Sequence, residues 1–280
     1  MRYGYYPGCS LKSSAIEYDV SLRAVFEQLG FELVEIPDWV CCGAAPAITI
    51  DRRLVDVLSA YNLALAAQVA PELVVPCPEC YKNFRHALKS LQEDEGVLNE
   101  VQAILGRDLP PLPKVKHPLE ILIEADFPQA QGLENLKVAC YHGCLLTRPV
   151  PSFDSPEFPT IMDRILGRVG YETVDFHYKA KCCGGALLLP YEDTAVELTA
   201  RVLKSAKDAG ANCVAVACPL CHMLLDAYQS SAEQKLNQEL NLPVFYFSQL
   251  LGIALGIEPA SLGFERLVVS PQPALEIMQT

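Results

Sequence analysis

The 280-residue sequence lacks the features of exported, membrane-spanning and nucleic-acid-binding proteins. Its first ten residues, MRYGYYPGCS, have no basic segment followed by an apolar stretch and a cleavage site, so we expect no secretory signal. The apolar run nearest to a membrane span, from Val244 to Ile257, is too short and contains Ser248 and Gln249. The formal net charge is −12, with no cluster of Lys and Arg, which argues against nucleic-acid binding. We therefore expect a cytoplasmic protein.

Cysteine, by contrast, is abundant. In a reducing compartment, 12 cysteines are more typical of metal ligands or redox centres than of structural disulfides. Ten of them form two sets with one internal order: a single cysteine, a Cys-Cys-Gly segment and a C-P-x-C segment. The first set is Cys9, Cys41, Cys42, Cys77 and Cys80, and the second is Cys144, Cys182, Cys183, Cys218 and Cys221. Four of the five pairs are 141 residues apart and the first pair 135, which indicates an internal repeat.

The sequence between the cysteines repeats in kind. Short apolar runs predict three strands in each half, at 2–6, 31–37 and 72–76 and again at 137–141, 171–176 and 212–217. Amphipathic segments predict helices between them, the longest at 51–68 and 191–209. This alternation favours an α/β fold of two pseudo-symmetric repeated domains, each a small parallel sheet flanked by helices. We place the domains at 1–133 and 134–280, with the Pro-rich segment 107–133 as the connection between the halves.

The ten repeated cysteines all follow the carboxyl ends of predicted strands. Ligands of parallel sheets gather outside these ends, so each half can bring five sulfurs together. A structural zinc site would use four ligands, and a vicinal pair cannot easily occupy two corners of one tetrahedron. A dithiol relay built on C-P-x-C leaves three sulfurs of each set unexplained. Iron–sulfur ligation accounts for more of the pattern, and a fifth sulfur favours a cluster of unusual shape.

The two cysteine sets resemble the duplicated, cysteine-rich CCG domain in the B subunit of heterodisulfide reductase. The opening YYPGCS, KHPLEIL around His117 and the closing FYFSQLLGIALG are also similar to that family. The resemblance implies that each set binds a non-cubane 4Fe-4S cluster with all five cysteines as iron ligands. It further implies that the two clusters face each other across the substrate site, where they reduce a disulfide or, in reverse, join two thiols.

The same resemblance implies partner chains. They are a ferredoxin-like iron–sulfur protein, similar to the C subunit of that reductase, and a flavoprotein, similar to its A subunit. The sequence has no G-x-G-x-x-G nucleotide fingerprint, so we expect electrons to pass through such partners. Two other functions stay open. CCG-domain proteins also serve as electron-transfer and anchoring subunits of succinate- or quinone-linked complexes, which attachment to a membrane through partners would permit. A zinc-stabilised interaction module without redox activity is the other.

A few residues outside the two sets are candidates for supporting roles. His142 and His222 adjoin predicted ligands and are candidates to donate hydrogen bonds to cluster sulfur or to carry protons to a product thiolate. Cys140 and Cys213 have no cysteine at the equivalent position of the other half, so we expect them in the core. For His117 we expect a structural role.

Overall fold

The computed structural model describes residues 1–148 and 153–278, and in them each half of the chain forms one four-stranded parallel sheet. The first sheet contains β1 (Arg2–Tyr5), β2 (Glu32–Glu35), β3 (Glu72–Val74) and β4 (Lys114–Lys116). The second contains β5 (Lys137–Tyr141), β6 (Glu172–Val174), β7 (Cys213–Val216) and β8 (Val244–Tyr246). Their orders, β2-β1-β3-β4 and β6-β5-β7-β8, are equivalent. The predicted α/β fold of two repeated domains is confirmed.

Helices flank both sheets. The first half contains α1 (Gly8–Leu11), α2 (Ile16–Gln28), α3 (Ala44–Ile50), α4 (Arg52–Ala66), α5 (Pro78–Glu93), α6 (Glu95–Leu105) and α7 (Pro118–Leu122). The second contains α8 (Ile161–Arg168), α9 (Glu192–Asp208), α10 (Pro219–Ala227), α11 (Gln229–Leu236), α12 (Phe247–Ala254) and α13 (Gln272–Ile277). The two long helices predicted from periodicity are α4 and α9. Asp51 fixes the start of α4 by accepting a hydrogen bond from the backbone N–H of Arg53 at 2.8 Å.

The segment 107–133 is more than a connection, because it contains β4 and α7. Sequence analysis missed this strand, which is three residues long and has prolines on both sides. The pair β8 and α12 is its equivalent in the second half, and the two helices begin alike. Glu120 accepts a hydrogen bond from the backbone N–H of His117 at 2.7 Å, and Gln249 accepts one from Tyr246 at 2.9 Å. Each half therefore contains a fourth strand that is followed by a capped helix.

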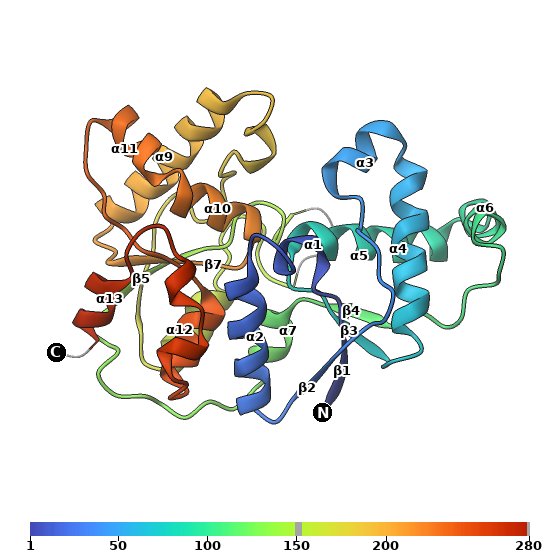
Figure 1. Cartoon of the computed structure of the whole chain (residues 1–280), viewed down its shortest axis with the longest axis horizontal. Coiled ribbons are helices and arrows are strands. Elements are labelled where there is room, and N and C mark those ends of the chain that lie inside the picture. The colour runs from blue at the N-terminus through green and yellow to red at the C-terminus, as the bar shows by residue number, and fades with distance from the viewer. Residues whose placement is uncertain (149–152, 279–280) are drawn as a thin grey trace.

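One core cluster extends through both halves, and a second, which contains Cys42 and Cys80, lies in the first half. Helix α12 of the second half packs on α2 of the first (Figure 1), and α7 of the first half packs on α8 of the second. Between α2 and the second half, the Tyr18 and Tyr246 rings stack with centroids 4.2 Å apart, and Ser21 Oγ lies 2.7 Å from Ser248 Oγ.

Across the described ranges, no helix is both long and apolar enough to cross a membrane.

Because the core is shared, we expect the two halves to unfold together. Phe247 is fully buried, and its ring meets Tyr18 edge-on with centroids 6.0 Å apart. Phe247→Ala should lower the free energy of unfolding by about 3–5 kcal/mol, and hydrogen exchange should speed up in both sheets. Leu189→Ala is the control, because that side chain is 97% exposed. Faster exchange confined to the second sheet would contradict a shared core.

Candidate functional site

Each C-P-x-C segment joins a central strand to a helix. After β3, Cys77 is the N-cap residue of α5, and Cys80 lies in its first turn. After β7, Cys218 and Cys221 hold the same positions on α10. Proline suits the first helical position, because its φ is helical and its missing N–H would have no partner there. The positive end of a helix dipole stabilises a thiolate, so these sulfurs lie where negative charge is favoured.

The Cys-Cys-Gly segments turn sharply through left-handed glycines. The φ angles of Gly43 and Gly184 are 85° and 92°, a region that side chains disfavour. A Cβ atom on Gly43 would approach Cβ of Ala47 to 2.7 Å, and one on Gly184 would approach Cα of Ala195 to 2.7 Å. No other residue fits at either position without displacing the helix that follows.

These turns also direct backbone donors at sulfur. In the second half, the N–H groups of Gly184 and Gly185 donate to the sulfurs of Cys182 and Cys183 at 3.3 and 3.4 Å. Neighbouring thiols also donate hydrogen bonds to these two sulfurs. Together with the backbone N–H groups, they lower the pKa of Cys182 and Cys183. A hydrogen bond from Cys144 lowers the pKa of Cys182 to about 6. The loop thus favours the thiolate form that binds metals.

A glycine precedes the single cysteine of each set. Gly8 and Gly143, with φ angles of 70° and 69°, come directly before Cys9 and Cys144. A Cβ atom on Gly8 would lie 3.3 Å from the sulfur of Cys80, and one on Gly143 would lie 3.3 Å from the sulfur of Cys221. These glycines therefore let the chain pass close to the sulfurs of the C-P-x-C segments.

The fold brings the members of each set together. The sulfurs of Cys42 and Cys80 are 3.1 Å apart, and those of Cys183 and Cys221 are 3.4 Å apart. Tyr6 adjoins the first group, with electrostatic contacts to Cys80, Cys42, Cys41 and Cys9. Tyr141 adjoins the second, with contacts to Cys221, Cys183, Cys144 and Cys182. Both tyrosines have a pKa raised first by burial and then by these sulfurs. The assignment of the ten cysteines as iron ligands stays a prediction.

Within each pair, the two thiols have pKa values shifted in opposite directions. Hydrogen bonds from Cys41 and Cys80 lower the pKa of Cys42 to about 3, whereas the bond to Cys42 raises the pKa of Cys80. In the second half, the bond between Cys183 and Cys221 lowers the pKa of the first and raises that of the second. Each set therefore contains a thiolate stabilised by thiols that can themselves lose protons to a metal.

The donor set fits an iron–sulfur cluster. Thiolates are the ligands that such clusters use, and backbone N–H groups directed at sulfur are typical of the surroundings that tune them. Among the residues that the structure describes, no three His, Cys, Asp or Glu side chains are placed to hold a single metal ion. Each set also extends from core to surface. Cys9, Cys41 and Cys182 are exposed, Cys77 and Cys144 are half-buried, and Cys42, Cys80, Cys183, Cys218 and Cys221 are buried.

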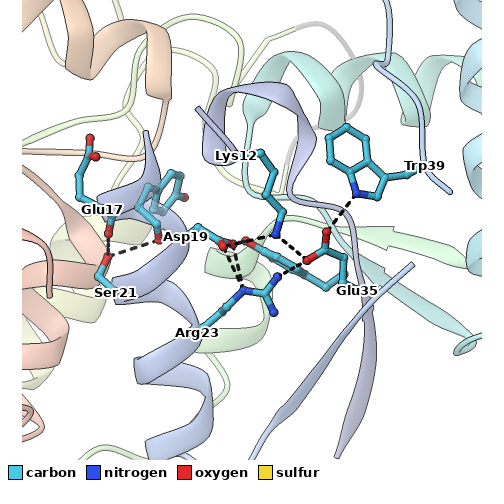
Figure 2. Close-up of polar contacts among 9 residues, drawn as sticks. Lys12, Glu17, Asp19, Ser21, Arg23, Glu35 and Trp39 are labelled. Carbon is cyan, nitrogen blue, oxygen red and sulfur yellow. Dashed lines mark hydrogen bonds and ion pairs between the residues drawn. The ribbon is translucent and has the colours of Figure 1, made fainter. Parts of the chain in front are cut away.

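A polar network braces the first set (Figure 2). Glu35, at the end of β2, accepts hydrogen bonds from Lys12 Nζ at 2.7 Å and from Trp39 Nε1 at 3.1 Å. Lys12 lies three residues after Cys9, and Trp39 lies two residues before Cys41. One carboxylate therefore ties together the two segments that present these exposed sulfurs.

The network continues into α2. Arg23 Nη2 donates to Glu35 at 2.7 Å, and its Nε lies 3.1 Å from both carboxylate oxygens of Asp19 (Figure 2). Tyr5 donates its hydroxyl to Asp19 at 2.6 Å, and the Arg23 guanidinium lies 4.3 Å from the centre of the Tyr5 ring. The sequence gives no pattern for this network, because its members come from β1, α2, β2 and the loops after α1 and β2.

His142 and His222 are both buried, and burial lowers the pKa of His142 to about 3 and that of His222 to about 4. His142 Nε2 accepts from the N–H of Met162 at 3.3 Å, so its Nδ1 donates to the Cys140 carbonyl at 3.1 Å. With both nitrogens engaged, His142 is better suited to positioning α8 than to carrying protons. His222 Nε2 donates to the Val244 carbonyl at 3.1 Å, a bond that holds α10 against β8.

The remaining candidates lie in the core. Cys140 and Cys213 are fully buried in β5 and β7, as expected, and burial raises the pKa of both thiols. His117 is also fully buried. Its Nε2 donates to the Pro76 carbonyl at 2.9 Å, and its Nδ1 accepts from the N–H of Leu119 at 3.3 Å. These bonds join α7 to the end of β3, just before the first C-P-x-C segment.

Sequence analysis missed two groups of ring contacts at equivalent places. In one group, the rings of Tyr18, Tyr246 and His222 are stacked. In the other, Phe153 and His117 are stacked, and Tyr81 meets both rings edge-on. In each group, the central ring caps the helix after the fourth strand, and one outer ring comes from the other half. Burial and then the charges of Cys77 and Cys218 raise the pKa of Tyr18. The first group therefore lies where the two cysteine sets approach each other.

The glycine turns can be tested by substitution. Gly43→Ala and Gly184→Ala should each lower the free energy of unfolding by more than about 1 kcal/mol, because the φ angle and the close contacts both oppose a Cβ atom. Urea unfolding measures the change. Gly167→Ala is the matched control: no atom lies within 4 Å of its added Cβ, and it lies inside α8. Variants at positions 43 and 184 as stable as that control would contradict the argument.

The network around Glu35 predicts a pH dependence. Burial raises the pKa of Glu35, but the hydrogen bonds from Lys12 and Trp39 outweigh it, so the net pKa is lowered. The carboxylate therefore stabilises the fold above its unfolded pKa of about 4.3, and this contribution is lost as the pH falls through the folded value. Glu35→Gln should be less stable than the original protein at pH 7, with the difference shrinking below about pH 4. A difference independent of pH in urea unfolding would exclude this role.

Comparison with known proteins identifies the family of this chain. The sequence matches the CCG cysteine-rich domain family twice, at residues 3–85 and 138–226. A solved structure of a hypothetical protein from Helicobacter pylori superposes with a TM-score of 0.78, at 16% identity, over 96% of this chain and 52% of that one. The chain thus spans about half the length of that protein, and at this identity the likeness shows the fold alone.

Curated relatives span nearly the whole chain. The membrane anchor subunit of 8-methylmenaquinol:fumarate reductase from Wolinella succinogenes is 33% identical over 95% of this chain and 96% of its own. The B subunit of ferredoxin:CoB-CoM heterodisulfide reductase from Methanosarcina mazei is 26% identical over 94% of this chain and 92% of its own. A protein from Archaeoglobus profundus that is described as similar to the B subunit of heterodisulfide reductase is 24% identical over 92% of each. The predicted resemblance is confirmed, and the chain belongs to the CCG cysteine-rich domain family, with one copy of the domain in each half.

Proposed function

We propose that this chain is an electron-transfer subunit in which each set of five cysteines holds a non-cubane 4Fe-4S cluster, and that disulfide–thiol redox chemistry takes place between the two. The observation that carries the proposal is the completeness of both sets. Each has a single cysteine, a vicinal pair and a C-P-x-C segment on equivalent elements, with sulfurs in contact at 3.1 and 3.4 Å. Similarity to the B subunit of heterodisulfide reductase supports an oxidoreductase role.

The duplication suits the stoichiometry of the reaction. One disulfide takes up two electrons and two protons to give two thiols, whereas an iron–sulfur cluster supplies one electron at a time. The chain contributes the positions of the two sets. The Tyr18 and Tyr246 rings stack between the halves, and both lie within electrostatic range of Cys77 and Cys218. The exposed sulfurs at Cys9, Cys41 and Cys182 keep the sets within reach of a substrate or partner.

A second function has an observation of its own. The fumarate reductase anchor is 33% identical over nearly the full length, a higher identity than that of the heterodisulfide reductase relatives. An electron-transfer and anchoring subunit of a quinol-linked complex would use the same two sets without a disulfide substrate. In either case, electrons would pass through partner subunits, for which the ferredoxin-like and flavoprotein chains of the reductase are the models. A cytoplasmic location stays part of the proposal.

Metal analysis tests the shared part of both functions. The chain should be produced with iron and sulfide supply, purified without oxygen and analysed for iron, acid-labile sulfide and zinc. Two 4Fe-4S clusters give about eight iron atoms per chain. Zinc with negligible iron in such a sample would end the redox proposal and leave a zinc-stabilised module.

Single substitutions test the disulfide chemistry. Cys42→Ser and Cys183→Ser should each reduce the iron content by about half and lower the rate of disulfide reduction at least tenfold, since each removes a ligand from one set. Cys213→Ala is the matched control, a buried cysteine outside both sets. Disulfide reduction at the original rate in either ligand variant would contradict the two-cluster reaction. No disulfide reduction by the iron-loaded protein, with electron exchange intact, would favour the anchoring function.

A further inference from the structure

The first half carries a basic surface that the acidic composition does not predict. Seven basic side chains lie on α5 and on the segments beside it, and we call them the α5 face: Arg52, Lys82, Arg85, His86, Lys89, Lys114 and Lys116. They line two hollows of about 540 and 570 Å³ on either side of the helix. Lys89 and Glu93 border both hollows. The face therefore extends continuously from α4 across α5 to the edge strand β4.

Much of this positive charge is available to a partner. Arg52 and Lys114 are exposed, and neither has an ion pair with any residue in the described part of the chain. Lys89 lies 3.9 Å from Glu93, with both side chains more than half exposed, so their attraction is weak. Lys82 pairs with Glu79 at the start of α5, and Lys116 pairs with Glu72 at 2.8 Å. An excess of positive charge remains after these pairs are counted.

The second half does not repeat this charge. The positions equivalent to Arg52, Lys82, Arg85 and Lys89 are Asp193, Met223, Asp226 and Ser230. Two acids and two neutral residues thus replace four positive charges. Asp226 is buried, and its carboxylate accepts the N–H groups of Val268 and Val269, so the C-terminal segment covers this end of α10. The fold and the cysteine chemistry are symmetric, but the α5 face is not.

The α5 face adjoins the first cysteine set directly. Asn83, a buried residue of α5, borders the 540 Å³ hollow, and its Nδ2 lies 3.4 Å from the carbonyl oxygen and 3.8 Å from the sulfur of Cys42. Cys80 lies on the same helix. A molecule bound on this face is thus separated from a predicted iron ligand by one side chain. Helices α3 to α6 lie at the end of the molecule away from α9, α11 and α13, so the second half leaves this side open (Figure 1).

We propose that the α5 face is the docking surface of an acidic, electron-carrying protein, and that electrons enter this chain at the first cysteine set. In each transfer, the reduced carrier loses one electron and the first set gains it. The face extends over two hollows and three elements, which is wider than one small anion requires. Opposite charges steer such a carrier to its site and orient it. The inference rests on the proposed electron-transfer function and adds the route by which electrons arrive.

Binding can be measured without any assay of activity. A small acidic ferredoxin serves as the probe, titrated calorimetrically into the intact chain at low and at high salt. Arg52→Glu combined with Lys89→Glu should weaken binding at least tenfold at low salt, and high salt should weaken binding of the unmodified chain. Arg201→Glu combined with Lys204→Glu is the matched control, because both side chains are about half exposed on α9 of the second half. It should change binding less than twofold.

The possible outcomes distinguish a failure of the docking surface from a failure of the proposed electron-transfer function. No binding by the unmodified chain at low salt, or equal weakening by the control pair, overturns the docking surface. Competition by phosphate beyond the effect of its ionic strength would assign the face to a small anion and also overturn it. If the chain holds no iron, the electron-transfer function fails, but the calorimetry still decides whether the face binds the acidic protein. With iron present, the Arg52 and Lys89 variant should lose reduction by ferredoxin and keep reduction by dithionite.

Discussion

Reciprocal packing between the two halves constrains the rest of the molecule. The helix after the fourth strand of each half lies against the first long helix of the other, α12 on α2 and α7 on α8. Stacked rings and the buried contact between Ser21 and Ser248 extend this interface. Because one core cluster extends through both halves and packs their sheets together, we expect the two sets to be held at a fixed separation. The proposed disulfide reaction, which uses two one-electron centres, requires such a fixed separation.

Within each half, the backbone determines where the sulfurs lie. Left-handed glycines at positions 43 and 184 turn the vicinal pair, and helix N-termini receive the C-P-x-C cysteines. Side chains then adjust the two sites differently. The network around Glu35 braces the first set, and the α5 face lies beside it alone. A symmetric scaffold thus supports two sites whose surroundings differ, which is consistent with distinct points for the entry and the use of electrons.

The sequence predicts some of these features and conceals others for physical reasons. Cysteine spacing and apolar runs reveal the repeat, because the ends of buried strands tolerate little variation in length. Strand β4 escapes prediction, since a three-residue edge strand between prolines has no period to detect. The ring groups are assembled from distant segments, so no local pattern marks them. In the α5 face, four basic residues share helical spacing within α5, but Arg52, Lys114 and Lys116 come from distant segments. The contacts of His142 likewise depend on Met162, twenty residues away.

The central claim is that the repeat builds two equivalent one-electron centres in one chain. A redox titration of the anaerobically purified, iron-loaded protein, followed by electron paramagnetic resonance, tests it most directly. The account predicts two iron–sulfur signals per chain, one of which disappears in Cys42→Ser and the other in Cys183→Ser. A single signal in the original protein, or one that survives both substitutions, would contradict it.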